Sequence, residues 1–175
     1  MIATACLTLA GNAHANAGKV LFSYGEGHIL DSQSNQLPLK KGAIVNQGDV
    51  IVTKERARAQ IKMTDGSFFS MRPNTELKIA TYNYDKKETD RSFFGLLRGG
   101  FRAITGLIGK NNNASYRVTT SIATMGIRGT HYTALLCQQG DCENEAGIND
   151  GLYIGVAEGG VSLFNDSGII DINPQ

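Results

Sequence analysis

The segment RARAQIKM, residues 56–63, alternates strictly between polar and apolar side chains. Because successive side chains of a β-strand point to opposite faces, this pattern places the four apolar residues on a buried face and the polar residues in solvent. Asp65 and Gly66 follow directly, and this dipeptide is the strongest short-range signal for a tight hairpin. The segment therefore predicts a half-buried strand that turns back on itself.

Short runs of β-branched, aromatic and aliphatic residues recur on both sides of this hairpin, separated by glycines and turn residues. In a chain with 21 Gly and 3 Pro, strands at this spacing indicate an all-β fold. We expect a sandwich, a roll or a short β-solenoid-like domain. The other predicted strands are residues 19–24, 50–53, 67–71, 76–80, 101–104, 116–119, 131–137, 152–156 and 161–164.

Residues 91–109, RSFFGLLRGGFRAITGLIG, fit two descriptions. They could form a short helix, or two strands on either side of Gly99 and Gly100. A glycine pair is costly inside a helix, so two strands are favoured. We expect residues 110–113 to form an exposed loop.

Length and composition limit the class of protein. A chain of 175 residues is enough for one domain with a real core, and no linker, low-complexity block or repeat divides it. With 41% hydrophobic and 19% charged residues, the chain is neither a coiled coil, a collagen-like fibre nor a wholly disordered protein. The net charge of +1 argues against nucleic-acid binding, and no apolar run is long enough for a transmembrane helix.

Residues 1–17, MIATACLTLAGNAHANA, contain no Lys, Arg, Asp or Glu. Ala13 and Ala15, and again Ala15 and Ala17, have the spacing of small residues at a signal-peptidase site. We therefore predict a signal peptide over residues 1–17, lacking the charged start of such signals, and a single domain over residues 18–175. The alternatives are a ragged cytoplasmic terminus or lipidation of Cys6, against which Ala3 argues because lipidation sites normally have Leu there.

Export would leave two cysteines, Cys137 and Cys142. An even count in an oxidising compartment predicts one disulfide, which closes the short loop CQQGDC. Free thiols and a metal ion held by the two thiolates are the alternatives. Two thiolates without a second cysteine pair make a poor zinc site.

Charge is distributed unevenly along the chain. All 17 basic residues lie at or before Arg128, whereas residues 129–175 contain acidic residues and no basic ones. The favoured interpretation is that the two ends of the chain pack together, so that their charges cancel within one domain. The alternative is a basic face that binds an acidic partner, such as an anionic envelope polymer.

Four blocks of sequence, in order, resemble the FecR domain family of bacterial envelope proteins. The first runs from GKVLFSYGEGHI at residues 18–29 through LKKGAIVNQGDVIVT at residues 39–53. The others are ARAQIKMTDGSFFSMRPNTEL at 57–77, LLRGGFRAI at 96–104 and YRVTTSIATMGIRGTHYTALL at 116–136. The resemblance covers residues 19–136 and leaves 137–175 as a C-terminal β extension. One departure is Ser121, where the family normally has Pro after Thr120.

The residues in these motifs are expected to have structural roles first. Gly48 and Asp49, like Asp65 and Gly66, are the usual residues of tight turns, in which the carboxylate caps its own backbone.

Residues 126–130, GIRGT, include Arg128, Gly129 and Thr130. Gly129 suits a sharp turn, and Thr130 contributes a turn or strand hydroxyl. The guanidinium of Arg128 either ties loops together or contacts a partner.

We expect no catalytic site, no metal site and no cofactor. After removal of the leader only His28 and His131 remain, and neither lies in a metal-binding or nucleophile motif. The acidic stretch 141–150 lacks the glycine and glutamate that an EF-hand loop requires.

The resulting hypothesis is an exported, non-catalytic FecR-domain protein in the periplasm or at the cell surface of a Gram-negative bacterium. Its partner would be an envelope protein or a cell-wall polymer. The alternative is a signalling component coupled to an outer-membrane receptor and an anti-sigma system, as the best-known relatives are in iron uptake. Fewer than twenty residues precede the predicted domain, which leaves no room for the anti-sigma segment of those relatives. A third hypothesis is an envelope hydrolase.

Overall fold

The computed structural model describes residues 16–142 and 148–174, and it confirms the all-β prediction. The described residues form fifteen strands, one short helix, α1 (Leu107–Asn111), and one 3-10 turn, η1 (Asn113–Ser115). The strands are β1 (Asn16–Tyr24), β2 (Gly27–Leu30), β3 (Gln36–Pro38), β4 (Ile44–Asn46), β5 (Val50–Thr53), β6 (Arg58–Met63), β7 (Phe68–Met71), β8 (Thr75–Asn83), β9 (Arg91–Ile104), β10 (Tyr116–Thr119), β11 (Thr124–Ile127), β12 (His131–Cys137), β13 (Gly151–Glu158), β14 (Val161–Asn165) and β15 (Gly168–Ile172).

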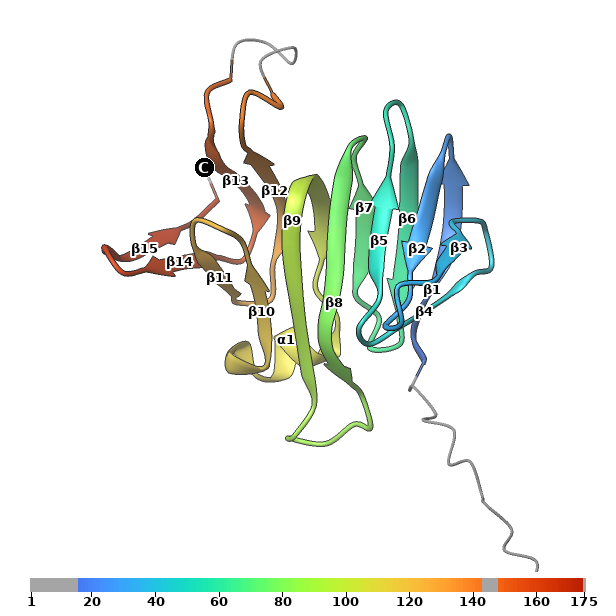
Figure 1. Ribbon diagram of the computed structural model, residues 1–175. Helices are drawn as coiled ribbons and strands as arrows, with labels where there is room; N and C mark the ends of the chain where they lie inside the picture. Colours follow the sequence, from blue (N-terminus) through green and yellow to red (C-terminus); the bar gives the residue numbers. More distant parts are fainter. Residues whose placement is uncertain (1–15, 143–147, 175) are drawn as a thin grey trace, which may run out of the picture.

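The strands form one continuous sheet that folds into two layers (Figure 1). Layer 1 has the strand order β4, β1, β6, β7, β9, β12, β13. Layer 2 has the order β3, β2, β5, β8, β9, β10, β11, β14, β15. Among the described strands, only the pair β9 and β10 is parallel.

The long strand β9 belongs to both layers. Its first part pairs with β8 and β10 in layer 2, and its last part pairs with β7 and β12 in layer 1. The change of layer falls at Gly99, whose φ is 70° and where a Cβ would overlap the carbonyl oxygen of Asn74. The expected break at the glycine pair is therefore a bend within one continuous strand. The helix that was the alternative for this segment is limited to α1.

Aromatic side chains fill the space between the layers. Phe69 of layer 1 and Phe94 of layer 2 have ring centroids 4.7 Å apart. Farther along, the hydroxyls of Tyr116 and Tyr132 share a hydrogen bond of 2.8 Å between the layers. Both tyrosines are fully buried, and this burial raises the pKa of each hydroxyl far above its ordinary value.

The strand pattern quoted first is present as expected. In β6, Ala59, Ile61 and Met63 are buried, while the polar residues between them are exposed. The turn after β6 also holds α1: the backbone N–H of Leu107 donates to the carbonyl oxygen of Asp65. The expected loop at residues 110–113 is exposed but includes the end of α1 and the start of η1.

Strand order largely follows chain order across both layers, so the N-terminal and C-terminal strands lie at opposite edges of the molecule (Figure 1). The expectation that the ends pack together and cancel their charges is therefore wrong. The acidic end of the chain forms one edge, with β13 and β15 outermost, and the basic part forms the remainder.

Strand β1 begins at Asn16, so it includes the last two residues of the predicted leader. Ala17 is completely buried in the core, and Asn16 pairs with Asn46. The remainder of the predicted leader, with Cys6, lies outside the described residues.

Candidate functional site

The turn at Asp65 and Gly66 is a buried hydrogen-bonding centre. The Asp65 carboxylate accepts bonds from the backbone N–H and the hydroxyl of Ser67, at 2.9 and 2.8 Å, and from the Tyr82 hydroxyl at 3.1 Å. Gly66 has a φ of 87°, which glycine adopts without strain. Burial, and next the negative charge of Asp65, raise the pKa of Tyr82. This carboxylate is occupied within the fold and is not presented to a ligand.

Gly48 and Asp49 form a second turn of the same kind. Gly48 has a φ of 93°, and its N–H donates to the carbonyl oxygen of Ile79. The buried Asp49 carboxylate accepts the N–H of Asn46 at 2.8 Å. The structure places this pair far from the chain's C-terminal edge, in the connection between β4 and β5.

Thr130 fixes the connection between β11 and β12. Its hydroxyl donates to the carbonyl oxygen of Gly160 at 2.8 Å and accepts the N–H of Arg128 at 3.1 Å. Its own N–H donates to the Thr105 hydroxyl. Gly129 occupies the left-handed region, with a φ of 58°. The side chain of Thr130 is therefore part of the fold's internal network.

Arg128 differs from its neighbours in this motif. Its side chain is exposed, and its guanidinium makes no hydrogen bond or ion pair with a residue that the structure describes. It does not tie described loops together. Of the two roles expected for Arg128, contact with a partner remains a prediction.

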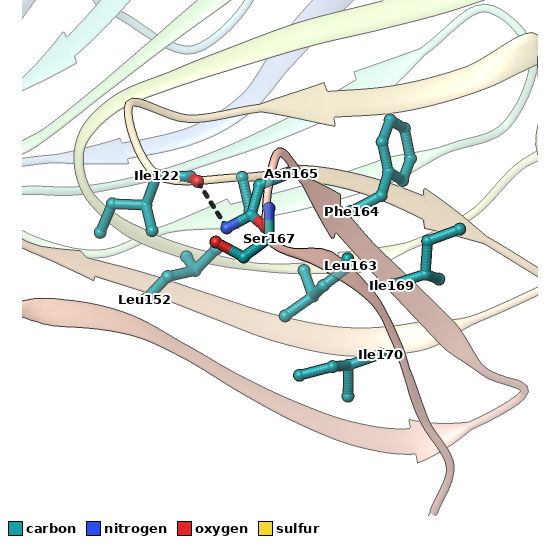
Figure 2. A pocket seen from close by; sticks show the side chains of 10 residues that line it. Ile122, Leu152, Leu163, Phe164, Asn165, Ser167, Ile169 and Ile170 are labelled. Atoms are coloured by element: carbon teal, nitrogen blue, oxygen red, sulfur yellow. Dashed lines mark hydrogen bonds between the residues drawn. The ribbon is translucent and has the colours of Figure 1, made fainter.

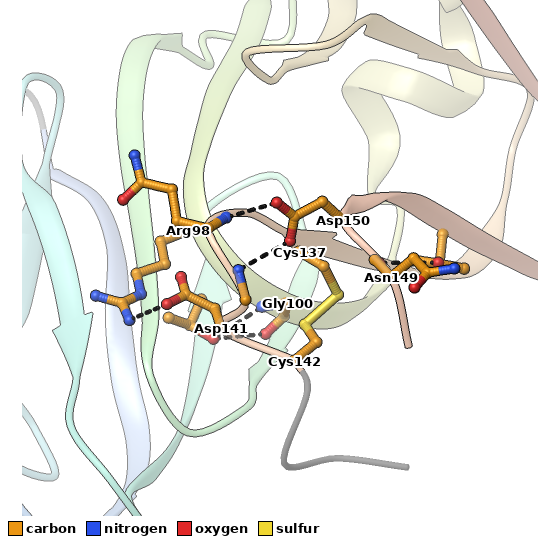
Figure 3. Close-up of a disulfide and its surroundings, with 11 residues drawn as sticks. Arg98, Gly100, Cys137, Asp141, Cys142, Asn149 and Asp150 are labelled. Carbon is orange, nitrogen blue, oxygen red and sulfur yellow. Dashed lines mark hydrogen bonds and ion pairs between the residues drawn. A yellow bond between two sulfur atoms is a disulfide. The ribbon is translucent and has the colours of Figure 1, made fainter. Parts of the chain in front are cut away.

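Cys137 and Cys142 form a disulfide at the tip of the β12–β13 hairpin (Figure 3). Beside it, the Arg98 guanidinium contacts the Asp141 carboxylate at 2.6 Å and ties the tip to β9. The Asp150 carboxylate accepts the N–H groups of Gln139 and Gly140, at 2.8 and 3.0 Å. The predicted disulfide is confirmed, and its surroundings organise the hairpin tip.

The C-terminal edge contains an apolar pocket of about 310 Å³ (Figure 2). Ile169 and Ile170 of β15 are 74% and 66% exposed, although large aliphatic side chains are normally buried. The Asn165 side chain donates to the carbonyl oxygen of Ile122 and holds the β14–β15 turn over the pocket. The other apolar residues that line the pocket are Ala123, Leu152, Leu163 and Phe164.

The outer edge of β15 pairs with no described strand, since its one partner is β14. An exposed strand edge offers N–H and C=O groups to a further strand, and exposed apolar side chains beside it add burial energy. The charged residues of the β14–β15 hairpin, Asp166 and Asp171, are both acidic. Together these features form the C-terminal edge site: β15, the apolar pocket and its acidic surroundings.

Sequence reasoning missed this site. Strand β15 was not predicted, nor were β2, β3, β4 and β11. The pocket combines side chains from the loop before β11, from β13 and from the β14–β15 hairpin, which are separated in the sequence. The only local signal was the apolar pair at residues 169–170, close to the end of the chain.

The described residues contain no group of three or more His, Cys, Asp or Glu side chains placed to hold a metal ion. In the same part of the chain, no helix has the length and apolar character that a membrane crossing requires.

The C-terminal edge site has the chemistry to bind an extended, apolar segment.

The fold and its turns define a two-layered β domain with open surfaces, and comparison with known proteins identifies the family. The family model for "FecR protein" matches residues 49–162, and the chain belongs to this family. The match begins later than the resemblance seen in the sequence and extends into β14. No curated protein sequence matches the chain.

A solved structure shares the fold. It is the crystal structure of a candidate anti-sigma factor from Parabacteroides distasonis ATCC 8503, with a TM-score of 0.52 and 12% sequence identity. The similarity covers 71% of this chain and 51% of that protein, so this chain spans about half of its length. At this identity the similarity shows a common fold.

Proposed function

We propose that this chain is an envelope regulatory domain of the FecR family that passes on a signal by contact with a protein partner, without catalysis. The observation that supports it is the family match over residues 49–162 on a fold shared with a candidate anti-sigma factor. The family match and the shared fold favour the signalling alternative over a general module that binds envelope proteins or cell-wall polymers. The family resemblance implies an outer-membrane receptor as the source of the signal.

The C-terminal edge site is the proposed contact. A partner segment could add a strand to β15 and place an apolar side chain in the pocket formed with Ile122 and Phe164. Because the surrounding charges are acidic, the matching segment is apolar and basic. The exposed guanidinium of Arg128, at the opposite end of β11 from the pocket, would then contact a partner carboxylate.

We further propose that the protein works outside the cytoplasm, in the periplasm or at the cell surface. The Cys137–Cys142 disulfide supports an oxidising compartment. Cleavage after Ala15 fits the fold better than cleavage after Ala17, because Asn16 begins β1 and Ala17 fills a core position. The mature protein would then begin at Asn16, which intact-mass analysis of the exported protein can test.

Deletion and complementation in the native bacterium test the regulatory role. We expect deletion to change transcription of a limited set of genes, and the wild-type chain to restore it. Ile170→Lys places a charge in the apolar edge and should fail to restore transcription, at an unchanged level of exported protein. Leu37→Lys is the matched control, since Leu37 is an exposed apolar residue on β3, at the opposite edge of layer 2.

Two outcomes would contradict the proposal. If deletion leaves transcription unchanged, the chain is not a regulatory component. If Ile170→Lys and Leu37→Lys restore transcription equally well, the signal passes through another surface.

A further inference from the structure

The outer face of layer 1 carries a straight row of side chains, separate from the C-terminal edge site. Residues in register on six neighbouring strands, β1, β6, β7, β9, β12 and β13, form this row. Neighbouring strands are about 4.8 Å apart, so each residue follows the last at that spacing. The row consists of Phe22, Gln60, Ser70, Arg102, Thr133 and Gly155.

Two hollows lie next to each other along this row. The first has a volume of about 340 Å³ and lies between Phe22, Arg58 and Arg102. The second has a volume of about 210 Å³ and lies between Arg102 and His131. Arg102 and Thr133 line both hollows, so they connect them. We call this feature the layer-1 groove.

The layer-1 groove is basic. Three arginines, Arg58, Arg72 and Arg102, line it, and its lining includes no acidic residue. The Nε–H of Arg102 donates to Nε2 of His131 at 2.7 Å, which orients the guanidinium. The other N–H groups of Arg102, and the guanidinium of Arg58, have no partner among the described residues. Two exposed guanidinium groups, those of Arg58 and Arg102, with no carboxylate in the groove lining, point to an anionic ligand.

The groove also offers contacts for a sugar. Gln60, Ser70 and Thr133 present amide and hydroxyl groups between the arginines. Phe22 is 47% exposed and presents its ring at one end of the row. An aromatic ring can stack on the apolar face of a sugar, while a guanidinium binds a carboxylate through two parallel hydrogen bonds.

We propose that the layer-1 groove binds a linear acidic polysaccharide whose sugar rings carry carboxylates. An acidic polypeptide fits less well, because five of the six strands under the groove pair with a strand on each side, and only β13, at one end of the groove, has a free edge. Nucleic acid fits less well, since one aromatic ring gives no series of stacking sites for successive bases. The inference does not depend on the regulatory proposal, because binding by the purified protein needs no partner.

Calorimetric titration of the purified full chain with a hexameric oligoguluronate tests the proposal. We expect binding that weakens as salt concentration rises, because the arginines of the groove are open to solvent. Cellohexaose, which lacks carboxylates, and inorganic phosphate should bind too weakly to measure. Hexaglutamate carries the same charge without sugar rings and should bind about tenfold more weakly, since it cannot stack on Phe22.

Single substitutions locate the site. Arg102→Gln and Arg58→Gln should each weaken oligoguluronate binding about tenfold, because each removes a charged hydrogen-bonding partner. Arg117→Gln is the matched control, since Arg117 is an exposed arginine on β10 of layer 2, and its binding should equal wild type. Phe22→Ala should weaken binding of oligoguluronate but leave that of hexaglutamate unchanged.

Three results would overturn the proposal. One is the absence of oligoguluronate binding at low salt. Another is equal affinity for hexaglutamate, which would identify an acidic polypeptide as the ligand. The third is an equal loss in Arg102→Gln and Arg117→Gln, which would show attraction to charge without a defined site. None of these results bears on the transcriptional test of Ile170→Lys.

Discussion

The layer-1 groove and the C-terminal edge site differ in charge, in polarity and in the state of the backbone beneath them. Except for β13 at one end, the groove lies on strands that are paired on both sides, so binding there depends on side chains, with the exposed Arg58 and Arg102 among them. The edge site has an unpaired strand edge on β15, apolar side chains and acidic neighbours. One surface suits an anionic chain, and the other suits an apolar, basic segment.

The difference follows from the strand order. In both layers the strands follow one another largely in chain order, so a gradient of charge along the sequence becomes a gradient across the molecule. Had the ends of the chain packed together, the same residues would have screened one another. The comparison therefore predicts two surfaces that share a core but bind different partners. How far they are coupled can be measured.

The largest effect should come from raising the pH, because this destabilises the fold that both surfaces share. Burial keeps Tyr116 and Tyr132 neutral in the fold, with a pKa far above that of an unfolded tyrosine. Their contribution is complete below about pH 10 and is lost as the pH rises toward the folded pKa. Each tyrosine should lower the free energy of unfolding by about 1.4 kcal/mol per pH unit in this range.

Denaturant unfolding between pH 9 and pH 12, followed by near-ultraviolet dichroism, measures this slope. Tyr132→Phe should reduce this slope by the contribution of one tyrosine, about 1.4 kcal/mol per pH unit. A slope that Tyr132→Phe leaves unchanged would contradict the expectation that folding raises the pKa of Tyr132.

The next largest effect should come from the bend that joins the layers. Gly99→Ala forces a side chain into the left-handed region and against the carbonyl of Asn74, at a cost of about 3 kcal/mol. Gly66→Ala is the control: its φ is also positive, but no atom lies within 4 Å of the added carbon. That change should cost about 1 kcal/mol. Equal losses in the two variants would mean that the close approach at Gly99 contributes nothing.

The sequence predicted the elements whose signal is local. Strict alternation identified β6, and Asp65 with Gly66 identified the turn after it, because both depend on neighbouring residues. Gly99 and Gly100 marked a break in residues 91–109, but a local pattern cannot show that one strand continues into a second layer. Strand β15 was missed because all but its last residue are exposed, so burial leaves no alternating pattern.

The two surfaces were beyond prediction for a different reason. The groove collects one residue from each of several strands, so its members lie tens of residues apart in the chain. The arginines at 58, 72 and 102 gave no spacing motif: Arg58 and Arg102 are ordinary exposed positions of β6 and β9, and Arg72 directly follows β7. Only the pairing of β6, β7 and β9 brings these segments side by side.

A smaller effect should come from the disulfide, which belongs to the C-terminal part of the molecule alone. Loss of the bond in a Cys137→Ser, Cys142→Ser double variant should cost about 2 kcal/mol, as expected for so short a loop. This corresponds to a decrease of about 4–8 °C in Tm, and a reductant should lower the wild-type Tm equally. The variant itself should not respond to reductant. Because the Arg98–Asp141 ion pair also holds the hairpin tip, oligoguluronate binding should persist. Its loss would show that the groove depends on this tip.

The smallest effects on stability should come from exchanging residues on the two surfaces themselves. Arg102→Gln and Ile170→Lys both alter exposed side chains, so each should change the free energy of unfolding by less than about 0.5 kcal/mol. Their effects on binding should nevertheless separate. Arg102→Gln should weaken oligoguluronate binding and still restore transcription in the absence of the glycan. Ile170→Lys should bind oligoguluronate as wild type does and fail to restore transcription.

The double variant completes this test. If the surfaces are independent, its two defects should equal those of the single variants, because sites this far apart contribute additively. If Arg102→Gln also impairs transcription, occupancy of the groove is itself the signal that the edge transmits. Ligand binding in the layer-1 groove would then control contact at the C-terminal edge site. In that case, adding oligoguluronate should change transcription in wild type but not in Arg102→Gln.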